Sequence, residues 1–276
     1  MIRFLSAFLI LVPAVAPSIA LAQDESPLDW SLIRIQDADT IVATLEFTSG
    51  LTLVARCQTG VYDLFVNGLP EVSRNKTTRD LAIQVGDEGE LKTTVWTVGS
   101  QRTAAFSRVP AMVARNLAEG GKLQILVPAE REGGRRTRYV MDVAPSSTAI
   151  EQTLTTCGRP LIDPREVRSE EIEGNGQDGL PDAVAWRTAP RPSFPSPVNG
   201  RSPREGYAVF SCVAKEDGGL TECQTESEQP AGYGLGQSVD RALPRARLQL
   251  TEQGAASGRP LAGRMILFAV NFRMAN

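Results

Sequence analysis

Two of the four cysteines flank a short turn, and their spacing suits a metal clip, a redox centre or a structural disulfide. The stretch FSCVAKEDGGLTECQ, residues 210–224, places Cys212 and Cys223 on either side of an Asp-Gly-Gly turn. If a hairpin turns around the Asp-Gly step, residues whose numbers add up to 435 face one another, as the two cysteines do. A four-residue loop, 216–219, brings their side chains closer than a two-residue loop does. We therefore expect the longer loop and a disulfide.

The other two cysteines, Cys57 and Cys157, lie far apart in the sequence. A metal site would need further ligands, and because the chain has no histidine, only cysteines and carboxylates could supply them. The cysteine spacings do not resemble a zinc motif, and a redox-active C-x-x-C pair is absent. We expect two disulfides and no metal. A Cys57–Cys157 bond would close a long loop and contribute about 4 kcal/mol; two unpaired buried thiols are the alternative.

The lack of histidine also removes the common Ser-His and Cys-His nucleophilic mechanisms. One Ser-Lys candidate remains, Ser73 and Lys76 in an S-x-x-K pattern, but its S-D-N partner motif is missing and it lies in a polar turn. The glycine-rich GYGLG, residues 232–236, precedes a helix without a βαβ unit, so we do not expect it to bind phosphate. These observations predict no catalytic residue, no cofactor and no enzyme activity.

The N-terminus indicates that the chain is exported. Arg3 precedes an apolar run, 4–22, that ends in Ala-Leu-Ala, which is the pattern of a signal peptide over residues 1–22 with cleavage before Gln23. An uncleaved inner-membrane anchor is the alternative, because the run is just long enough to cross a bilayer. Export favours oxidised cysteines and a periplasmic location. The formal charge of −3 gives no basic field for a nucleic-acid partner.

Residues 23–162 are predicted to form a mainly-β domain with two helices. Short stretches of alternating or β-branched residues predict closely spaced strands, which suggests a sandwich or a curled sheet. These stretches are 40–47, 51–57, 61–66, 81–85, 91–98, 122–127 and 137–143. Segment 110–121 begins with proline and ends in glycine, and segment 145–158 has a Ser/Thr cap with Ile150 and Leu154 on one stripe. Both patterns are typical of helices.

A change in composition separates this domain from a second one. Residues 163–204 are first acidic and rich in glycine and then rich in proline, which predicts an extended linker with few contacts between the domains. Residues 205–276 contain a hairpin, a helix near 235–243 that ends before Pro244, and a final strand. This ββαβ order predicts a three-stranded antiparallel sheet with a helix packed on it, and an α+β class for the chain.

Residues 194–274 resemble the C-terminal domain of the TonB energy-transducer family through an ordered series of motifs. The series is Phe194-Pro195, VFSCVA, a DGGL turn, PAGYGLGQS before the helix, GRPLAG, and the closing strand ILFAVNF. The resemblance implies a periplasmic domain in a Gram-negative envelope, without a catalytic residue, whose partners add a strand to its last strand. An exposed sheet edge offers unpaired N–H and C=O groups to such a peptide. The implied partner-binding residues are Met265, Ile266, Leu267, Phe268, Ala269, Val270, Asn271 and Phe272.

Alternation along this last strand divides its side chains between two faces. The bulkier set should face the helix and consists of Ile266, Phe268, Val270 and Phe272. The remaining set should face outward and consists of Met265, Leu267, Ala269 and Asn271. Truncation of the outward side chains should then matter little. Proline at Ala269 or Asn271 should matter much, because it removes an N–H from the edge.

The chain departs from the transducer family in its organisation. A transducer needs a membrane anchor and a long proline-rich rod, whereas this chain has a signal peptide, a short linker and a folded domain in front. That front domain is similar, in LTLVARC, VWTV, AFSRVP and YVMDVAPSSTAIEQTLTTCG, to a periplasmic family associated with type VI secretion. We expect a non-catalytic scaffolding protein that binds envelope proteins, such as an outer-membrane receptor or a secretion component, by strand addition. A membrane-anchored transducer for outer-membrane transport is the first alternative. An envelope hydrolase that uses carboxylates or Ser-Lys chemistry is the second.

Overall fold

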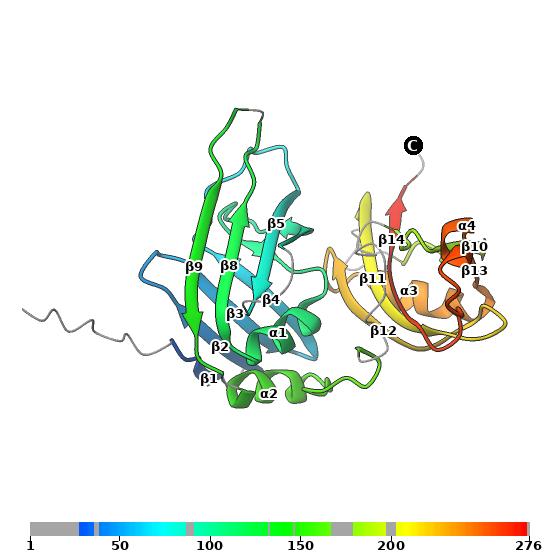
Figure 1. Ribbon diagram of the computed structural model, residues 1–276, viewed down its shortest axis with the longest axis horizontal. Helices are drawn as coiled ribbons and strands as arrows, with labels where there is room; N and C mark the ends of the chain where they lie inside the picture. Colours follow the sequence, from blue (N-terminus) through cyan, green and yellow to red (C-terminus); the bar gives the residue numbers. More distant parts are fainter. Residues whose placement is uncertain are drawn as a thin grey trace, which may run out of the picture.

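The computed structural model shows two packed units with antiparallel sheets, so the chain is of the α+β class (Figure 1). It describes residues 28–35, 39–86, 91–131, 133–145, 147–166, 179–196 and 203–274. We call residues 28–166 the N-terminal unit and residues 179–274 the C-terminal unit. The expected signal peptide, 1–22, and the middle of the expected linker, 167–178, lie outside the described residues.

The N-terminal unit contains one nine-stranded antiparallel sheet with the strand order β1-β2-β3-β4-β7-β6-β5-β8-β9. Its strands are β1 (Ser31–Ile35), β2 (Thr40–Glu46), β3 (Thr52–Gln58), β4 (Val61–Asn67), β5 (Thr78–Val85), β6 (Lys92–Val98), β7 (Ala105–Phe106), β8 (Gly121–Val127) and β9 (Thr137–Val143). The seven strands expected from the sequence are present. The short strands β1 and β7 were not expected.

The core of this unit lies between one face of the sheet and two helices, α1 (Pro110–Ala118) and α2 (Ser147–Thr156). Alternation places every second residue on this face, so that Ile41 on β2, Cys57 on β3 and Tyr62 on β4 form one cross-strand row. Leu117 of α1 and Leu154 of α2 are buried in the same core. The helices pack on β2, β3 and β4, as Figure 1 shows.

The sheet curls until its two outer strands approach each other at one end. Leu28, which precedes β1, forms a parallel bridge to Val143 at the end of β9. Two backbone hydrogen bonds hold it, from Leu28 N to Asp142 O at 3.2 Å and from Ala144 N to Leu28 O at 2.8 Å. The curled sheet expected from the strand spacing is therefore present.

A disulfide joins Cys57 on β3 to Cys157, which directly follows α2. The two Cα atoms are 5.6 Å apart, and the Cys57 side chain is buried in the core beneath the helix. The predicted bond is confirmed, and it fastens α2 to the sheet across a sequence separation of 100 residues.

The C-terminal unit is built on a three-stranded antiparallel sheet with the order β12-β11-β14. Its strands are β11 (Glu205–Ala214), β12 (Leu220–Gln229) and β14 (Met265–Arg273), and helix α3 (Leu235–Ala242) packs on one face. A 3-10 turn, η3 (Leu243–Arg245), follows α3 where the helix was expected to end. Strand β13 (Arg247–Leu250) and helix α4 (Glu252–Ala256), which were not expected, stand between η3 and β14.

Part of the expected linker is a strand, so the interpretation of 163–204 as an extended connector is wrong for the residues described. Strand β10 (Val184–Thr188) pairs with β13 in a separate two-stranded sheet. The Trp186 ring packs edge-on against Phe268 at 5.3 Å, and Phe194 packs against Phe272 at 5.7 Å. The few apolar residues of this polar segment are buried against residues distant in the sequence, which local composition does not reveal.

The loop between β11 and β12 is one residue shorter than expected. Lys215 N donates to Gly219 O at 2.8 Å, and Gly218 N donates to Lys215 O at 3.0 Å, which leaves residues 216–218 in the loop. Gly218 has a positive φ of 80°. A glycine in the left-handed region directly after a tight turn favours this three-residue loop over the four-residue one.

The two units also pack against each other, contrary to the expectation of few contacts. A small apolar cluster at the interface contains Val109 before α1, Tyr207 and Val209 of β11 and Leu267 of β14. This interface could not be predicted from the sequence, because each strand shows only a normal alternation. No helix among the described residues is long and apolar enough to cross a membrane.

Candidate partner-binding site

Strand β14, which carries the predicted partner-binding residues, is an edge strand of the three-stranded sheet. It runs antiparallel to β11, with Met265 opposite Val213 and Arg273 opposite Glu205. The other edge of the sheet is β12. The position of β14 therefore meets the first requirement for strand addition.

The face of β14 that was expected to contact the helix does so. Ile266, Phe268 and Phe272 are buried in the core together with Leu235 and Val239 of α3. Val270 is half-buried and packs against the same core.

The opposite face is covered by the N-terminal unit, so the expectation that it faces outward is wrong for most of its length. Met265 and Leu267 are buried, and Leu267 and Ala269 pack against Val109 and Met112 of the N-terminal unit. Only Asn271 of this set is exposed. Truncation of Met265 or Leu267 should consequently destabilise the fold or the interface.

The backbone of β14 presents its free edge through the odd-numbered residues. Ala214 N donates to Arg264 O at 2.8 Å, and Met274 N donates to Arg204 O at 2.9 Å, so even-numbered residues bond toward β11. The N–H and C=O groups of Ala269, Asn271 and Arg273 then point away from it. Gly179 O accepts from Ala269 N at 3.3 Å, so the chain itself occupies the middle of the edge.

The end of β14 opens into a cleft of about 920 Å³ between the two units. Five of its lining residues are cationic and one is acidic, and these charged residues are Arg74, Lys76, Arg102, Arg108, Arg273 and Glu205. Asn271 and Arg273 line the cleft from β14. The cleft therefore places free backbone groups beside an excess of positive charge.

The floor of the cleft is fixed by contacts between the units. The Arg108 guanidinium lies over the Tyr207 ring, 4.2 Å from its centroid. The Tyr207 hydroxyl and the Thr97 hydroxyl share a hydrogen bond, and Ser227 Oγ donates to Arg108 O at 2.7 Å. Since these bonds join β6, the β7–α1 loop and the sheet of the C-terminal unit, the cleft walls are held in one arrangement.

Of the Ser-Lys candidate, Lys76 lines this cleft, while Ser73 binds a carboxylate. The Ser73 hydroxyl donates to Glu130 Oε2 at 3.0 Å, and Ser73 N donates to Glu130 Oε1 at 3.3 Å. The hydrogen bond from the Ser73 hydroxyl is the main cause that lowers the pKa of Glu130. Arg102 meanwhile binds the carbonyl oxygens of Ser73 and Lys76 and fixes the turn. Ser73 thus serves as a donor to a carboxylate in a structural contact.

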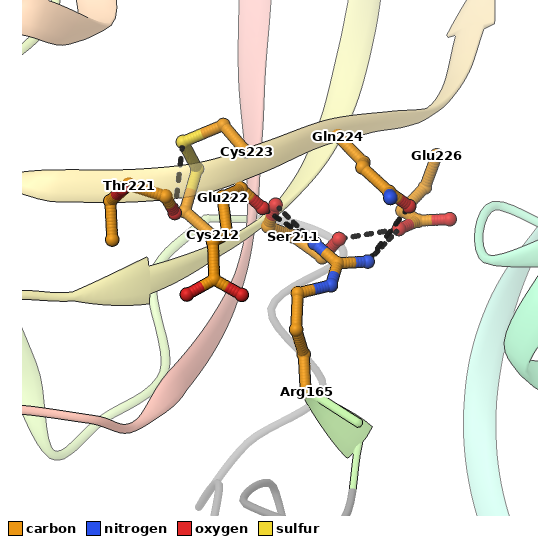
Figure 2. Close-up of a disulfide and its surroundings, with 8 residues drawn as sticks. All are labelled: Arg165, Ser211, Cys212, Thr221, Glu222, Cys223, Gln224 and Glu226. Carbon is orange, nitrogen blue, oxygen red and sulfur yellow. Dashed lines mark hydrogen bonds and ion pairs between the residues drawn. A yellow bond between two sulfur atoms is a disulfide. The ribbon is translucent and has the colours of Figure 1, made fainter. Parts of the chain in front are cut away.

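The hairpin cysteines form the expected disulfide, with Cα atoms 4.1 Å apart (Figure 2). With the shorter loop alone, Cys212 and Cys223 would be out of register. A bulge at Glu222, which has a φ of 49°, shifts the register by one residue, so that the expected pairing is restored where Ser211 lies opposite Gln224. The prediction of a disulfide is confirmed, while the predicted route through a longer loop is wrong. Within the described residues, no group of three or more side chains could hold a metal ion.

Beside this disulfide, the side chain of Arg165 reaches from the N-terminal unit into the C-terminal sheet (Figure 2). Arg165 Nη1 donates to Glu222 O at 2.7 Å and to Ser211 O at 3.4 Å, and Nη2 donates to Gln224 Oε1 at 2.8 Å. The Arg165 side chain is 5% exposed. It therefore secures the disulfide-bonded hairpin to the end of the N-terminal unit.

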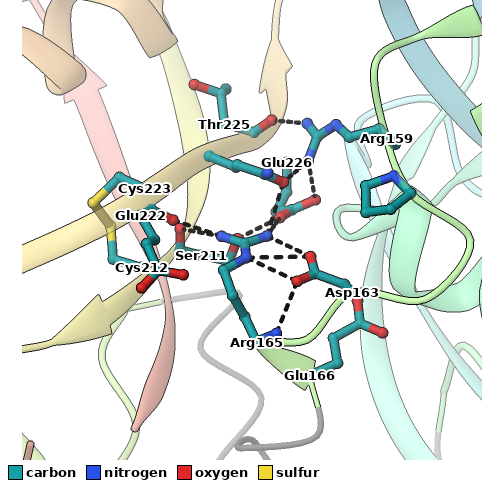
Figure 3. Close-up of polar contacts among 12 residues, drawn as sticks. Arg159, Asp163, Arg165, Glu166, Ser211, Cys212, Glu222, Cys223, Thr225 and Glu226 are labelled. Carbon is teal, nitrogen blue, oxygen red and sulfur yellow. Dashed lines mark hydrogen bonds and ion pairs between the residues drawn. A yellow bond between two sulfur atoms is a disulfide. The ribbon is translucent and has the colours of Figure 1, made fainter. Parts of the chain in front are cut away.

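Arg165 belongs to a buried group of charges at the interface, which we call the charged cluster (Figure 3). Its members are Arg115, Arg159, Asp163, Arg165, Glu166 and Glu226. Arg165 pairs with Asp163 at 2.7 Å, and Arg159 pairs with Glu226 at 3.2 Å. The three positive and three negative groups balance, so the charged cluster acts as a connection between the units and offers no net charge to a ligand.

The two carboxyl groups at the N-terminal side of the charged cluster respond differently to their surroundings. Burial opposes ionisation of Asp163, but hydrogen bonds from Arg165 and the charges of Arg165 and Arg115 together lower its pKa. Burial raises the pKa of Glu166, against the opposing charge of Arg115. Asp163 is thus the firmly ionised partner of the two.

The chain matches no protein-family model, no curated protein and no solved structure. The cleft and the charged cluster therefore rest on the geometry described above. Sequence reasoning missed both, because their residues come from segments that are far apart in the sequence, and no motif links them. The run from Arg159 to Glu166, which carries two basic and two acidic residues across the start of the expected linker, was one available signal.

Proposed function

We propose that the protein is a non-catalytic periplasmic binding or scaffolding protein. In this proposal the cleft between the units holds an extended acidic segment of an envelope protein alongside the end of β14. The observation that carries it is the position of Asn271 and Arg273, which line a cleft with five cationic residues and one acidic residue and whose backbone groups point away from β11. Backbone groups would give affinity for an extended chain, and the charges would select an acidic one.

Several further features support this proposal. Two disulfides indicate an oxidising compartment, as the periplasm is. The order β12-β11-β14 with α3 on one face supports the resemblance of this unit to the TonB C-terminal domain. The contact between Ser73 and Glu130 supports a non-catalytic role for the Ser-Lys pattern.

The proposal differs from strand addition along the whole of β14. Gly179 O already accepts from Ala269 N, so a partner strand is confined to the exposed end of the edge. Few backbone hydrogen bonds are available there, and the basic residues of the cleft must contribute much of the affinity. Binding should therefore weaken as the salt concentration rises.

The test uses two synthetic peptides. One alternates valine with glutamate, and the other alternates valine with lysine. Affinity for the purified protein is measured by fluorescence anisotropy for wild type, Asn271→Ala and Asn271→Pro. Because the Asn271 N–H points away from β11, proline there should leave the sheet intact and remove only the outward donor. We expect the glutamate peptide to bind wild type and Asn271→Ala equally and Asn271→Pro at least about tenfold more weakly.

Circular dichroism confirms that each variant is folded, and Asn271→Ala is the matched control for loss of the side chain. The proposal is wrong if the folded Asn271→Pro variant binds the glutamate peptide as tightly as wild type does. Equal affinity for the lysine peptide would also contradict it. The intact mass of protein purified from the envelope separates this proposal from a membrane-anchored transducer, since cleavage before Gln23 removes the anchor.

A further inference from the structure

A second pocket lies on the side of the C-terminal sheet that faces away from the N-terminal unit. It is formed between the segment that follows β10 and helix α3, and its volume is about 660 Å³. Four arginines line it: Arg187 from β10, Arg191 from the segment that follows β10, and Arg241 and Arg245 from α3 and η3. None of the described residues that line the pocket is acidic. In a chain whose formal charge is −3, this is a marked local excess of positive charge.

The arginines of this pocket differ from the others that the fold uses. Arg56, Arg115, Arg159, Arg165 and Arg247 each pair with a carboxylate. By contrast, the side chains of Arg191, Arg241 and Arg245 make no hydrogen bond or ion pair with another described residue. Their guanidinium groups therefore retain their donors for a ligand.

The spacing of two of these arginines is unfavourable without a counter-charge. Arg241 and Arg245 are four residues apart across the end of α3, so they lie on the same side and repel each other. Their position at the C-terminal end of the helix satisfies the helix dipole. That role, however, explains neither Arg187 nor Arg191, which a different segment brings to the same pocket.

The backbone that carries these side chains is fixed. Arg187 Nη2 donates to Asp217 O at 2.9 Å, which holds this side chain across the β11–β12 loop. Ser238 Oγ of α3 donates to Ser193 O and fastens the segment after β10 to the helix. The framework of the pocket is therefore held in one arrangement, so a ligand has to order only the side chains of the unpaired arginines.

We propose that this pocket binds a ligand that presents two or more phosphate oxygens, either a soluble phosphate compound or the phosphate headgroup of a lipid. Guanidinium groups match the geometry of phosphate oxygens and bind them through paired hydrogen bonds. The volume is in the range of small-molecule sites and exceeds that of a single inorganic ion. Ala189, Pro192 and Ala242 add a small apolar surface for the part of the ligand that bears the phosphates.

The experiment measures binding of two probes to the full protein as purified. Isothermal titration with inorganic pyrophosphate tests the soluble source, and co-sedimentation with phosphatidylcholine vesicles, with and without phosphatidylglycerol, tests the lipid source. The test variant is Arg191→Ala/Arg241→Ala. The matched control is Arg135→Ala/Arg136→Ala, which removes two exposed arginines from the β8–β9 hairpin.

We expect at least one probe to bind wild type and the control equally and to bind the test variant at least about tenfold more weakly, because charged hydrogen bonds are lost. Pyrophosphate binding assigns the soluble source, and binding that requires phosphatidylglycerol assigns the lipid. Arg241→Lys keeps the charge but loses the paired bonds, so it should bind more weakly than wild type and guards against misfolding of the double variant. The proposal is overturned if neither probe binds wild type, or if both variants bind with the same affinity. Tighter, arginine-dependent binding of duplex DNA would reassign the pocket to a nucleic-acid polymer and likewise overturn it.

Discussion

Replacement of Arg165 by methionine tests whether the charged cluster joins the two units. The Arg165 guanidinium bonds to Asp163 at 2.7 Å, to Glu222 O at 2.7 Å and to Gln224 Oε1 at 2.8 Å, and its side chain is 5% exposed. Methionine fills a similar volume but leaves Asp163 buried, with Arg115 3.8 Å away as its remaining cation. Loss of one partner from a buried ion pair costs about 3–5 kcal/mol.

The assay is urea unfolding followed by tryptophan fluorescence in two reporter backgrounds. Replacing Trp30 and Trp96 by phenylalanine leaves Trp186 to report on the C-terminal unit, and replacing Trp186 leaves the other two to report on the N-terminal unit. With a denaturant slope of about 2–3 kcal/mol per molar, Arg165→Met should lower the midpoint by roughly 1–2 M. The two reporters should coincide in the parent protein and separate in the variant, because the units then unfold independently.

Arg56→Met is the matched control for this prediction. Arg56 also pairs with an aspartate, Asp63, at 2.5 Å, but both side chains are about 30% exposed and belong to the same unit. An exposed pair contributes at most about 1 kcal/mol, so this change should leave the two reporters coincident. The reasoning is refuted if Arg165→Met shifts the midpoint no more than Arg56→Met does.

Three other predictions address the covalent, steric and ionic contributions to stability. Replacing Cys57 and Cys157 by serine should lower the free energy of unfolding by about 4–5 kcal/mol, as urea titration would show, because their bond closes a loop with a sequence separation of 100. Gly232→Ala should cost about 1–2 kcal/mol for its positive φ alone. Gly218→Ala should cost clearly more in the same assay, because its Cβ would lie 2.2 Å from a carbonyl oxygen of β13. The lowered pKa of Asp163 means that its contribution is complete at neutral pH and is lost as the pH falls through that pKa. The urea midpoint of Asp163→Asn should accordingly fall less steeply below about pH 4 than that of wild type.

Much of the strand pattern could be predicted because it is local. In β2, β3 and β4 every second side chain enters the core, so the sequence alternation reports the structure directly. The residues of β1 are exposed throughout, and β7 has two residues, so neither has a pattern to detect. Both disulfides could be predicted because few other uses for the cysteines remained in a chain without histidine that was expected to be exported.

The parts that could not be predicted depend on contacts between distant segments. Strand β10 forms because β13 is available to pair with it, and Trp186 is half-buried because it packs against Phe268. Asp163 and Arg165 were assigned to a solvated linker, since charged residues in a polar segment are normally exposed. Their burial depends on Gln224 and Glu226 of β12, which in the sequence resemble an ordinary solvent-facing pair.

Amide hydrogen exchange in the presence of the glutamate peptide is the most direct test of the proposed function. Asn271 and Arg273 line the cleft and their N–H groups point away from β11, so an extended segment bound along this end of β14 should accept hydrogen bonds from them and slow their exchange. The amides of Ile33 and Ile35 on β1, an edge strand of the other sheet, serve as the internal reference. We predict protection at Asn271 and Arg273 with no change at β1. Unchanged exchange at both β14 amides with saturating peptide, or protection only at β1, would contradict the proposal that the cleft and the end of β14 form the partner-binding site.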